Sequence, residues 1–493
     1  MPIGVLLASL VTAIAIFPLS DERYRWRTTL NLFGALTQLL LIGIMLWGVS
    51  QQRQYETHLP LVQGLDLVLR ADALGILFAT LSSVLWLITI SYAIGYIEES
   101  PHRSRFFGFF NLSIMATMGI AMANNLFTLL FFYEILTLTT YPLIVHRGTA
   151  KALRAGKIYL RYTLAGSTLL LLGIVWLYQL TKLQDFTEGG ILSSLSTANY
   201  PSLIFIFMLL TLGFGVKAAL APLHSWLPRA AIAPTPVSAF LHAVAFVKVG
   251  TFGMMRVVYD VYGVYFAYHL GVLTLLTLIA VITIIYSSVR ALFQDDLKRL
   301  LAFSTVNQAA YITLGISLFG TLGITVSIVH FIHQGLVNLT LFLCAGNFAH
   351  TLGIHKICGM HGVGKRMPWT MAAFTLGALS MIGLPPFAGF ISTWYLGMAA
   401  LESGMSWIII ILTLSSLLNA AYFLPILHVA WFQEAKGDWS KARDVGQYET
   451  SLNLLIPPLV TVVLVIAAGF LAYTPLSPLA WAKVIATHEY VNK

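Results

Sequence analysis

Three ionisable side chains lie within long apolar stretches of the sequence, where a charge persists only if it has a partner or a use. Glu134 stands in LLFFYEILTLTTYPL, Lys217 in FGVKAALAPLHSWLP and Lys248 in LHAVAFVKVG. Placing such a group in the middle of a membrane costs roughly 3 kcal/mol unless it is paired or hydrated. A carboxylate that moves relative to a buried ammonium changes how strongly that ammonium holds its proton. These three residue types therefore predict proton transfer.

Four histidines and a polar helix face extend this chemistry. His224 and His242 lie between the two lysines in the sequence, and an imidazole changes its charge near neutral pH, so each can relay a proton. His330 and His333 lie in the middle of a later apolar stretch. His330 and Asn338, with a glutamine halfway between them, share one helix face because they are spaced in steps of four. This face suits a hydrated polar file.

Each of these residues also has a structural interpretation, which the sequence leaves open. Glu134 can be a carboxylate that a neighbouring helix satisfies, and Lys248 can extend its ammonium to the membrane surface. A lone histidine on an apolar helix is equally consistent with a core residue whose ring is satisfied by its neighbours.

The composition defines the elements that must carry these side chains. Of 493 residues, 58% are apolar and 10% are charged, and the mean hydropathy is +0.83, whereas soluble domains carry about 25% charged residues. The two cysteines, Cys344 and Cys358, are too few for a disulfide framework or a zinc site. We predict an all-α integral membrane protein with about fourteen transmembrane helices. They are expected at 3–19, 29–48, 73–97, 106–123, 126–146, 158–181, 202–230, 235–259, 268–292, 300–319, 321–350, 368–400, 406–433 and 451–475.

Two of these stretches are too long for one crossing and contain prolines. Pro222 and Pro228 lie in the seventh, and Pro385 and Pro386 lie in the twelfth. Because proline interrupts a helix, both are predicted to be discontinuous. The breaks are five helices apart, so five-helix units have opposite orientations, which predicts two inverted repeats. The predicted units are 1–105 (helices one to three), 106–260 (helices four to eight), 261–433 (helices nine to thirteen) and 434–493 (helix fourteen and a tail).

Lysine and arginine are unevenly distributed between the two sets of connections. If the N-terminus lies outside, nineteen of the 28 fall in inner connections and five in outer ones. Cytoplasmic loops carry the excess of basic residues. We therefore predict a multi-pass protein of a prokaryotic inner (plasma) membrane with both termini outside. The basic residues follow the topology and form no separate patch, which excludes nucleic acid as a partner and leaves anionic lipid or partner subunits. The start at Met1 has no basic region before its apolar run, so we expect no cleaved signal.

Three segments resemble a known family. They are WLPRAAIAPTPVSAFLHAVAFVKVG (226–250), QDDLKRLLAFSTVNQAAYI (294–312) and GLPPFAGF (383–390). They are similar to the antiporter-like membrane subunits of respiratory complex I, the D-type subunit of Mrp cation/proton antiporters and subunits of group 4 membrane-bound hydrogenases, and APTPVSAFLHAV most resembles the Mrp D-type. The resemblance implies a fourteen-helix fold with two inverted half-channels, no bound cofactor, and other membrane subunits as partners.

The resemblance also implies roles for particular residues. Glu134 corresponds to a carboxylate that modulates its partner lysine, Lys217 to that proton-holding partner, and Lys248 to the connection towards the centre. Two positions depart from the family pattern. Asn338 stands where the family usually has a lysine, and Thr393 stands just after the second break, where it usually has Lys or Glu. The first half-channel therefore matches the family, and the second lacks its usual ionisable groups.

We predict a proton-translocating, or monovalent cation/proton-antiporting, subunit of a multisubunit membrane complex, with sodium as a candidate counter-ion. The alternative is a structural subunit that has lost complete transport, which the departures at Asn338 and Thr393 favour. A stand-alone solute carrier is a third hypothesis, although no substrate-sized polar constellation is visible. No nucleotide loop, metal cluster or nucleophile–base pair predicts catalysis. Any redox chemistry, as in an NADH:quinone oxidoreductase or a hydrogenase, would belong to the partners.

Overall fold

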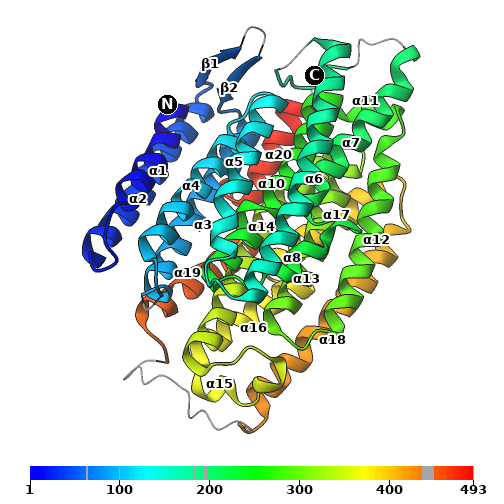
Figure 1. Ribbon diagram of the computed structural model, residues 1–493. Coiled ribbons are helices and arrows are strands. Elements are labelled where there is room, and N and C mark those ends of the chain that lie inside the picture. The colour runs from blue at the N-terminus through cyan, green and yellow to red at the C-terminus, as the bar shows by residue number, and fades with distance from the viewer. Residues whose placement is uncertain (63–64, 99, 183–184, 193–196, 436–448, 492–493) are drawn as a thin grey trace.

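The computed structural model describes residues 1–62, 65–98, 100–182, 185–192, 197–435 and 449–491. In these ranges the chain folds into a bundle of long helices that run side by side, with one short β-hairpin at one end (Figure 1). The predicted basic residues Lys436, Lys441, Arg443 and Lys493 lie outside the described residues.

The chain begins with α1 (Pro2–Ile16), α2 (Tyr24–Ser50), β1 (Glu56–Val62), β2 (Leu65–Arg70), α3 (Ala73–Tyr96), α4 (Arg103–Ala121), α5 (Leu126–Ile144), α6 (Ala150–Thr181), η1 (Thr197–Asn199), α7 (Tyr200–Ala218), η2 (Leu223–Ser225), α8 (Trp226–Ala230), α9 (Thr235–Phe240), η3 (Leu241–Ala245), α10 (Val247–Arg256) and η4 (Val257–Tyr262). It continues with α11 (Val264–His269), α12 (Val272–Leu292), α13 (Leu297–Ser317), α14 (Thr321–Leu352), η5 (Ile357–Gly359), α15 (Val363–Arg366), α16 (Pro368–Ile382), α17 (Ala388–Glu402), α18 (Ile408–Phe432), α19 (Leu452–Phe470), α20 (Pro478–Ile485) and η6 (Ala486–Val491). The turns η3, η4 and η6 are π-helical, and the other three are 3₁₀-helical.

The helices confirm the predicted all-α membrane fold. Among the described residues, 10 helices are long and apolar enough to cross a membrane. The other predicted stretches also coincide with helices, but α1 and α16 have only 15 residues each. The helices α4 and α13, with 19 and 21 residues, are more polar than those ten. The number of crossings therefore stays a prediction.

Several element boundaries differ from the prediction. The helix predicted at 158–181 begins at Ala150, because Thr149 caps it by accepting a hydrogen bond from the Ala152 N–H at 3.2 Å. The stretch 268–292 divides at Gly271, whose φ of 76° ends α11 before α12 starts. Strands β1 and β2 pair antiparallel in a connection for which no element was predicted. They have only 7 and 6 residues.

Both predicted helix breaks are present. At the first, Ala219 has a φ of 57°, and the Leu220 N–H turns back to the Gly215 carbonyl at 3.0 Å. At the second, Gly383 has a φ of 89°, and the Leu384 N–H turns back to the Leu379 carbonyl at 3.1 Å. In each case the helix ends in a left-handed residue and resumes after a proline-containing turn. The two halves are therefore interrupted in the same way.

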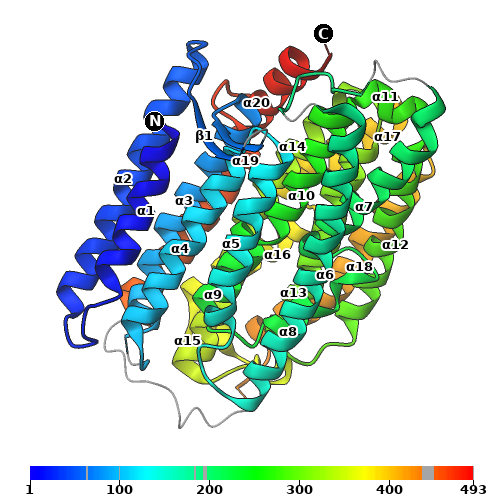
Figure 2. The same cartoon turned by 45° about the horizontal axis from the view of Figure 1, so that its top comes forward.

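Two helices form the centre of the bundle. The most apolar windows of Thr235–Tyr262 and Thr321–Leu352 are fully buried, whereas those of α2, α6 and α18 are one-third buried. The outer helices thus present apolar side chains to the surroundings, as a membrane requires. In both views α1 starts, and α20 lies, at the end that carries the β-hairpin (Figures 1 and 2). This arrangement agrees with two termini on one side of the membrane.

Candidate functional site

Lys217 lies at the end of α7, just before the first break, and is fully buried. Its Nζ donates a hydrogen bond to the Tyr133 carbonyl at 2.7 Å and stands 3.3 Å from the centroid of the Tyr133 ring. The Tyr133 hydroxyl donates to the Gly213 carbonyl at 3.2 Å, which joins α5 to α7. A carbonyl oxygen and an aromatic face both favour a cation, and so does the C-terminal end of a helix. The break therefore creates a place for this ammonium.

Glu134 follows Tyr133 on α5 and is partly buried. Its Oε1 atom is buried and has no hydrogen-bond partner in the part of the chain that the structure describes. The carboxylate interacts electrostatically with Lys217. However, none of the three ion pairs found among the described residues includes either side chain. The predicted pair is brought together without direct contact.

Lys248 lies on α10 in the centre of the bundle and is 0% exposed. Its Nζ has no hydrogen-bond partner within the described ranges and stands 4.7 Å from the centroid of the Phe331 ring. It interacts electrostatically with His330 and His333 on α14. Its buried position excludes the interpretation in which the ammonium reaches the membrane surface.

The centre of α14 connects this lysine to the second half. His330 Nδ1 shares a hydrogen bond of 2.8 Å with the Ser392 hydroxyl on α17, beyond the second break. The His330 ring stacks on Tyr311 of α13 with centroids 5.5 Å apart. Both ring nitrogens of His333 and both side-chain polar atoms of Gln334 are buried without a partner among the described residues. A helix with this many unpartnered polar groups is suited to bind water.

The contacts of the remaining predicted residues are as follows. Asn338 Nδ2 donates to the His242 carbonyl at 3.4 Å, and the His242 ring stacks on Phe342 at 4.3 Å. His224 contacts the Tyr286 ring at 4.8 Å, so it faces α12. Thr393 is partly buried on α17, and its hydroxyl oxygen would lie 3.7 Å from a Cβ added at Gly383. Thr393 therefore lies near the second break, Asn338 lies beside His242, and His224 faces α12.

A buried charged cluster was not predicted. Arg256 Nη1 donates to Asp260 Oδ2 at 2.9 Å, and the same guanidinium is paired with both oxygens of Asp72 at the start of α3. Burial raises the pKa of Glu489 on η6 to about 8, together with the charges of Asp72 and Asp260. The available signal was the i, i+4 pair Arg256 and Asp260 within an apolar stretch. Asp72 and Glu489 are too distant in sequence to be assigned to it.

A polar cluster between α13 and α18 was also missed. Asn307 Nδ2 donates to Asn419 Oδ1 at 3.0 Å, and the Tyr422 hydroxyl donates to the same oxygen at 2.7 Å. Ser415 lies 3.3 Å from Asn307. Neutral polar residues in apolar helices carry no distinctive spacing, so only their contacts reveal them. No group of three His, Cys, Asp or Glu side chains in the described ranges is arranged to hold a metal ion.

The chain as a whole has counterparts among known proteins. Residues 123–419 match the family model described as NADH:quinone oxidoreductase/Mrp antiporter, TM. The chain belongs to this family. The predicted resemblance is therefore confirmed, and the matched range contains all nine of the residues singled out from the sequence.

Individual relatives cover most of the chain. NADH-quinone oxidoreductase subunit N of Desulforudis audaxviator (strain MP104C) is 33% identical over 427 residues, which cover 85% of this chain and 84% of that protein. The D-type subunit of the Na(+)/H(+) antiporter of Alkalihalophilus pseudofirmus (strain ATCC BAA-2126 / JCM 17055 / OF4) is 28% identical, with 82% and 80% covered. A chain of the Mrp complex from Dietzia sp. DQ12-45-1b has a TM-score of 0.86 at 22% identity, with 99% and 98% covered, and so shares the fold.

Proposed function

We propose that this member of the NADH:quinone oxidoreductase/Mrp antiporter family translocates protons, or exchanges a monovalent cation for protons, as a subunit of a multisubunit membrane complex. The observation that carries the proposal is the series of buried ionisable groups on successive central helices. Glu134 and Lys217 lie on α5 and α7, Lys248 on α10, and His330 and His333 on α14. Glu134 interacts electrostatically with Lys217, and Lys248 interacts electrostatically with His330 and His333. Between the two lysines the link is the packing of α10 against the end of α7, where Gly250 lies against Ala218.

The unpartnered polar atoms support a route through these groups. Lys248 Nζ, His242 Nδ1 and both ring nitrogens of His333 are buried without a hydrogen-bond partner among the described residues. Leaving a buried polar group unsatisfied costs about 1–3 kcal/mol, so such groups bind water or exchange protons where they can. Several such unpartnered atoms lower the stability of the fold, and they supply groups that can pass on a proton.

The coupling that we propose depends on distance. Lys217 is held by the Tyr133 carbonyl while Glu134, the next residue on α5, is not bonded to it. A small movement of α5 relative to α7 therefore changes the charge interaction without breaking an ion pair. Because electrostatic energies are large in a low-dielectric interior, such a movement can transfer a proton to or from the lysine.

The names of the relatives support the proposed setting. They are subunits of an NADH-quinone oxidoreductase and of a Na(+)/H(+) antiporter, so we propose other membrane subunits as partners and sodium as a candidate counter-ion. We further propose that residues 106–260 and 261–433 form the inverted repeats, that both termini lie outside a prokaryotic plasma membrane, and that anionic lipid contacts the inner face.

Charge-removing variants of the first pair test this function. In membrane vesicles carrying the assembled complex, we expect Lys217→Ala and Glu134→Gln each to abolish most cation-driven or redox-driven proton movement, recorded with a pH-sensitive dye. The exposed residues Lys365 and Glu98 provide matched controls, Lys365→Ala and Glu98→Gln, which should retain transport. Near-normal proton movement in either pair variant, at equal assembly, would refute the proposed site.

A second candidate function rests on the second half-channel. Asn338 and Thr393 stand where the family resemblance implies ionisable groups, which favours a structural subunit that does not complete transport. For such a subunit, Lys217→Ala would leave proton movement by the complex unchanged while variants that disturb helix contacts would reduce its assembly. The same vesicle assay thus separates the two functions.

A further inference from the structure

A large cavity lies where α6 and α13 begin, away from the buried ionisable series. It has a volume of about 740 Å³, which falls within the roughly 300–1,000 Å³ of small-molecule sites. Strand residue Val68 bonds to Thr128 at the start of α5, so the start of α6, which follows the end of α5, lies at the opposite end from the β-hairpin. This is the predicted inner side of the membrane.

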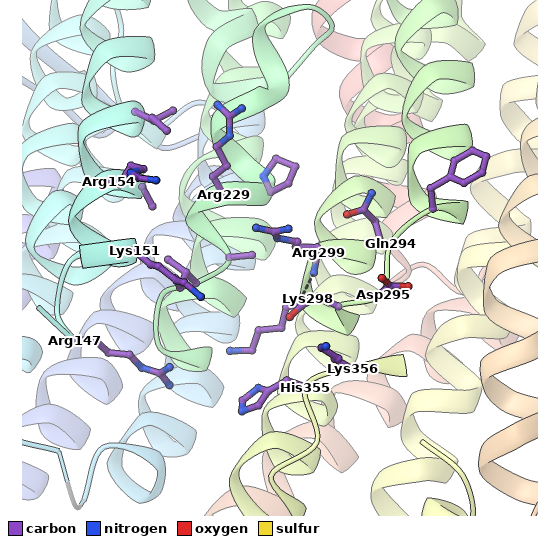
Figure 3. A pocket seen from close by; sticks show the side chains of 17 residues that line it. Arg147, Lys151, Arg154, Arg229, Gln294, Asp295, Lys298, Arg299, His355 and Lys356 are labelled. Carbon is purple, nitrogen blue, oxygen red and sulfur yellow. Dashed lines mark hydrogen bonds between the residues drawn. The ribbon is translucent and has the colours of Figure 1, made fainter. Parts of the chain in front are cut away.

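The cavity is strongly basic. Seven Lys and Arg side chains line it, against two Asp side chains. Figure 3 shows Arg147, Lys151 and Arg154 on one side and Lys298 and Arg299 on the other, with the cavity between them. None of these cations forms an ion pair in the part of the chain that the structure describes. Asp296 instead caps α13 by accepting from the Arg299 N–H at 3.0 Å.

The N-termini of α6 and α13 lie at this cavity, and basic residues follow each of them, although Asp296 caps α13. The first turns of α6 and α13 contain no acidic residue. They contain Lys151, Lys298 and Arg299 instead, and Arg154 follows in the next turn of α6. Helix N-termini favour negative charge, and cations there are unfavourable. A bound anion would offset the dipole of α6 and the repulsion among the cations.

His355, which also lines the cavity, is subject to the same positive charges. Partial burial and the charge of Lys298, with a contribution from Arg147, lower the pKa of His355 in the connection after α14. The nearby carboxylate of Asp296 acts in the opposite direction and does not prevent this shift. Lys298 and Arg147 therefore act on this imidazole as positive charges of the cavity wall.

We propose that this cavity binds the phosphate groups of an anionic ligand, and that in the membrane the ligand is a phospholipid headgroup. One guanidinium group can donate two parallel hydrogen bonds to two oxygens of a phosphate, so the arginines that line this cavity suit phosphate binding. Ile158, Ile232 and Phe293 contribute an apolar part of the wall, and Phe293 is 74% exposed beside it. A basic pocket with an apolar rim between membrane helices fits a headgroup followed by its acyl chains. The inference rests on the proposed orientation and names the site at which the inner face would bind anionic lipid. It is independent of the proposed transport, because none of these residues belongs to the ionisable series.

Lipid retention by the purified, delipidated complex tests this site. Native mass spectrometry would follow binding of phosphatidylglycerol, with phosphatidylcholine as the zwitterionic comparison. We expect the wild type to retain phosphatidylglycerol and the double variant Arg154→Gln/Arg299→Gln to lose at least about ten-fold in affinity. Both residues are exposed, so the fold should persist. The variant Arg25→Gln/Lys365→Gln removes the same charge from exposed positions on α2 and α15, outside the cavity, and should bind like the wild type.

A second arm distinguishes the source of the phosphate. Inorganic pyrophosphate is added to the delipidated complex, and the thermal unfolding midpoint is measured. Stabilisation by pyrophosphate in the wild type alone, without phosphatidylglycerol retention, would assign the site to a free phosphate compound. Equal retention of phosphatidylglycerol by the cavity and control variants would overturn the proposal. So would the absence of any effect of either probe. Lys217→Ala should bind both probes normally, so the result is independent of transport.

Discussion

Lys217 and Lys248 are both fully buried, but different groups surround their ammonium atoms. Lys217 has a carbonyl acceptor at 2.7 Å and an aromatic face at 3.3 Å. Lys248 has an aromatic face at 4.7 Å and, among the described residues, no hydrogen-bond acceptor. A hydrogen bond to a charged group is worth about 1.5–3 kcal/mol. We therefore expect Lys217 to be the better place to store a proton and Lys248 to be better suited to pass one on.

We expect His330→Ala to impair proton movement severely if the second half-channel conducts. The imidazole links Lys248 on one side to the Ser392 hydroxyl on the other, and alanine would interrupt this link. Positioned general acid–base groups raise the rate of proton transfer by roughly 10²–10⁴-fold. The rate of proton movement in vesicles should therefore fall by at least about 10²-fold. The exposed His269 supplies the control, His269→Ala. Normal transport by an assembled His330→Ala complex would exclude this route.

Introducing a lysine at position 338, where the family pattern usually has one, complements that experiment. Asn338→Lys should be tolerated, or should change the pH optimum of transport, because the residue lies beside the His242 carbonyl, which can accept from an ammonium. A structural subunit would show no transport effect from either change. Measuring the rate against pH for both variants separates these outcomes.

Isolated charges were predictable from the sequence, and charge clusters were not. Glu134, Lys217 and Lys248 each stand alone among apolar residues, so residue type and local context were sufficient to select them. The pairing of Arg256 with Asp72 joins residues 184 positions apart. Only the folded chain brings them together. His224 shows the converse, because its position between the lysines in sequence does not bring it beside them in space.

At the scale of helices, the contact between α7 and α10 depends on a glycine. A Cβ on Gly250 would lie 2.8 Å from Ala218 Cα and from the Lys217 carbonyl carbon. We expect Gly250→Ala to push α10 from the end of α7, to lower stability by about 1–3 kcal/mol, and to reduce transport. Gly397 on α17 has no neighbouring atom within 4 Å of such a Cβ. Gly397→Ala should therefore be neutral or slightly stabilising. Equal thermal midpoints for the two variants would contradict this account.

The C-terminal turn η6 should dock in a pH-dependent manner. The pKa of Glu489 rises from 4.5 to about 8 because of burial and then the charges of Asp72 and Asp260, which Arg256 only partly offsets. The docked state therefore binds a proton that the undocked state releases. Docking is strongest below about pH 4.5 and weakens as the pH rises towards 8. Hydrogen-exchange protection factors of 486–491 should fall over this range, and Glu489→Gln should remove the dependence. Protection of 486–491 that rises with pH would contradict the raised pKa of Glu489 as the cause.

Helix breaks could be predicted because excess length and proline both indicated them, whereas short elements could not. The stretches around Pro222 and Pro386 were too long for one crossing, and the structure interrupts both. The hairpin of β1 and β2 consists of strands of 7 and 6 residues, too short for a distinct periodicity. Its position depends on tertiary contacts, such as the bridge between Leu69 and Ala123.

At the scale of the whole molecule, a native cysteine reports the orientation in the membrane. Cys358 is exposed in the connection after α14, and Cys344 is buried. A membrane-impermeant maleimide should label Cys358 in inverted vesicles and not in intact cells. Arg53→Cys, combined with Cys358→Ser, places the exposed thiol at the hairpin end and should show the opposite behaviour. Labelling of Cys358 in intact cells would show that the orientation is the opposite of the predicted one.

The span Thr235–Tyr262 contains two π-helical turns, Leu241–Ala245 and Val257–Tyr262, with α10 between them. Each π turn holds one surplus residue relative to an α-helix. One residue of α-helix corresponds to about 100° of rotation. If the surplus residue of the first turn moved past Lys248, this side chain would rotate by that angle while the helix ends kept their places. Torsion within one central segment would therefore give Lys248 different neighbours while the ends of that segment stayed in place.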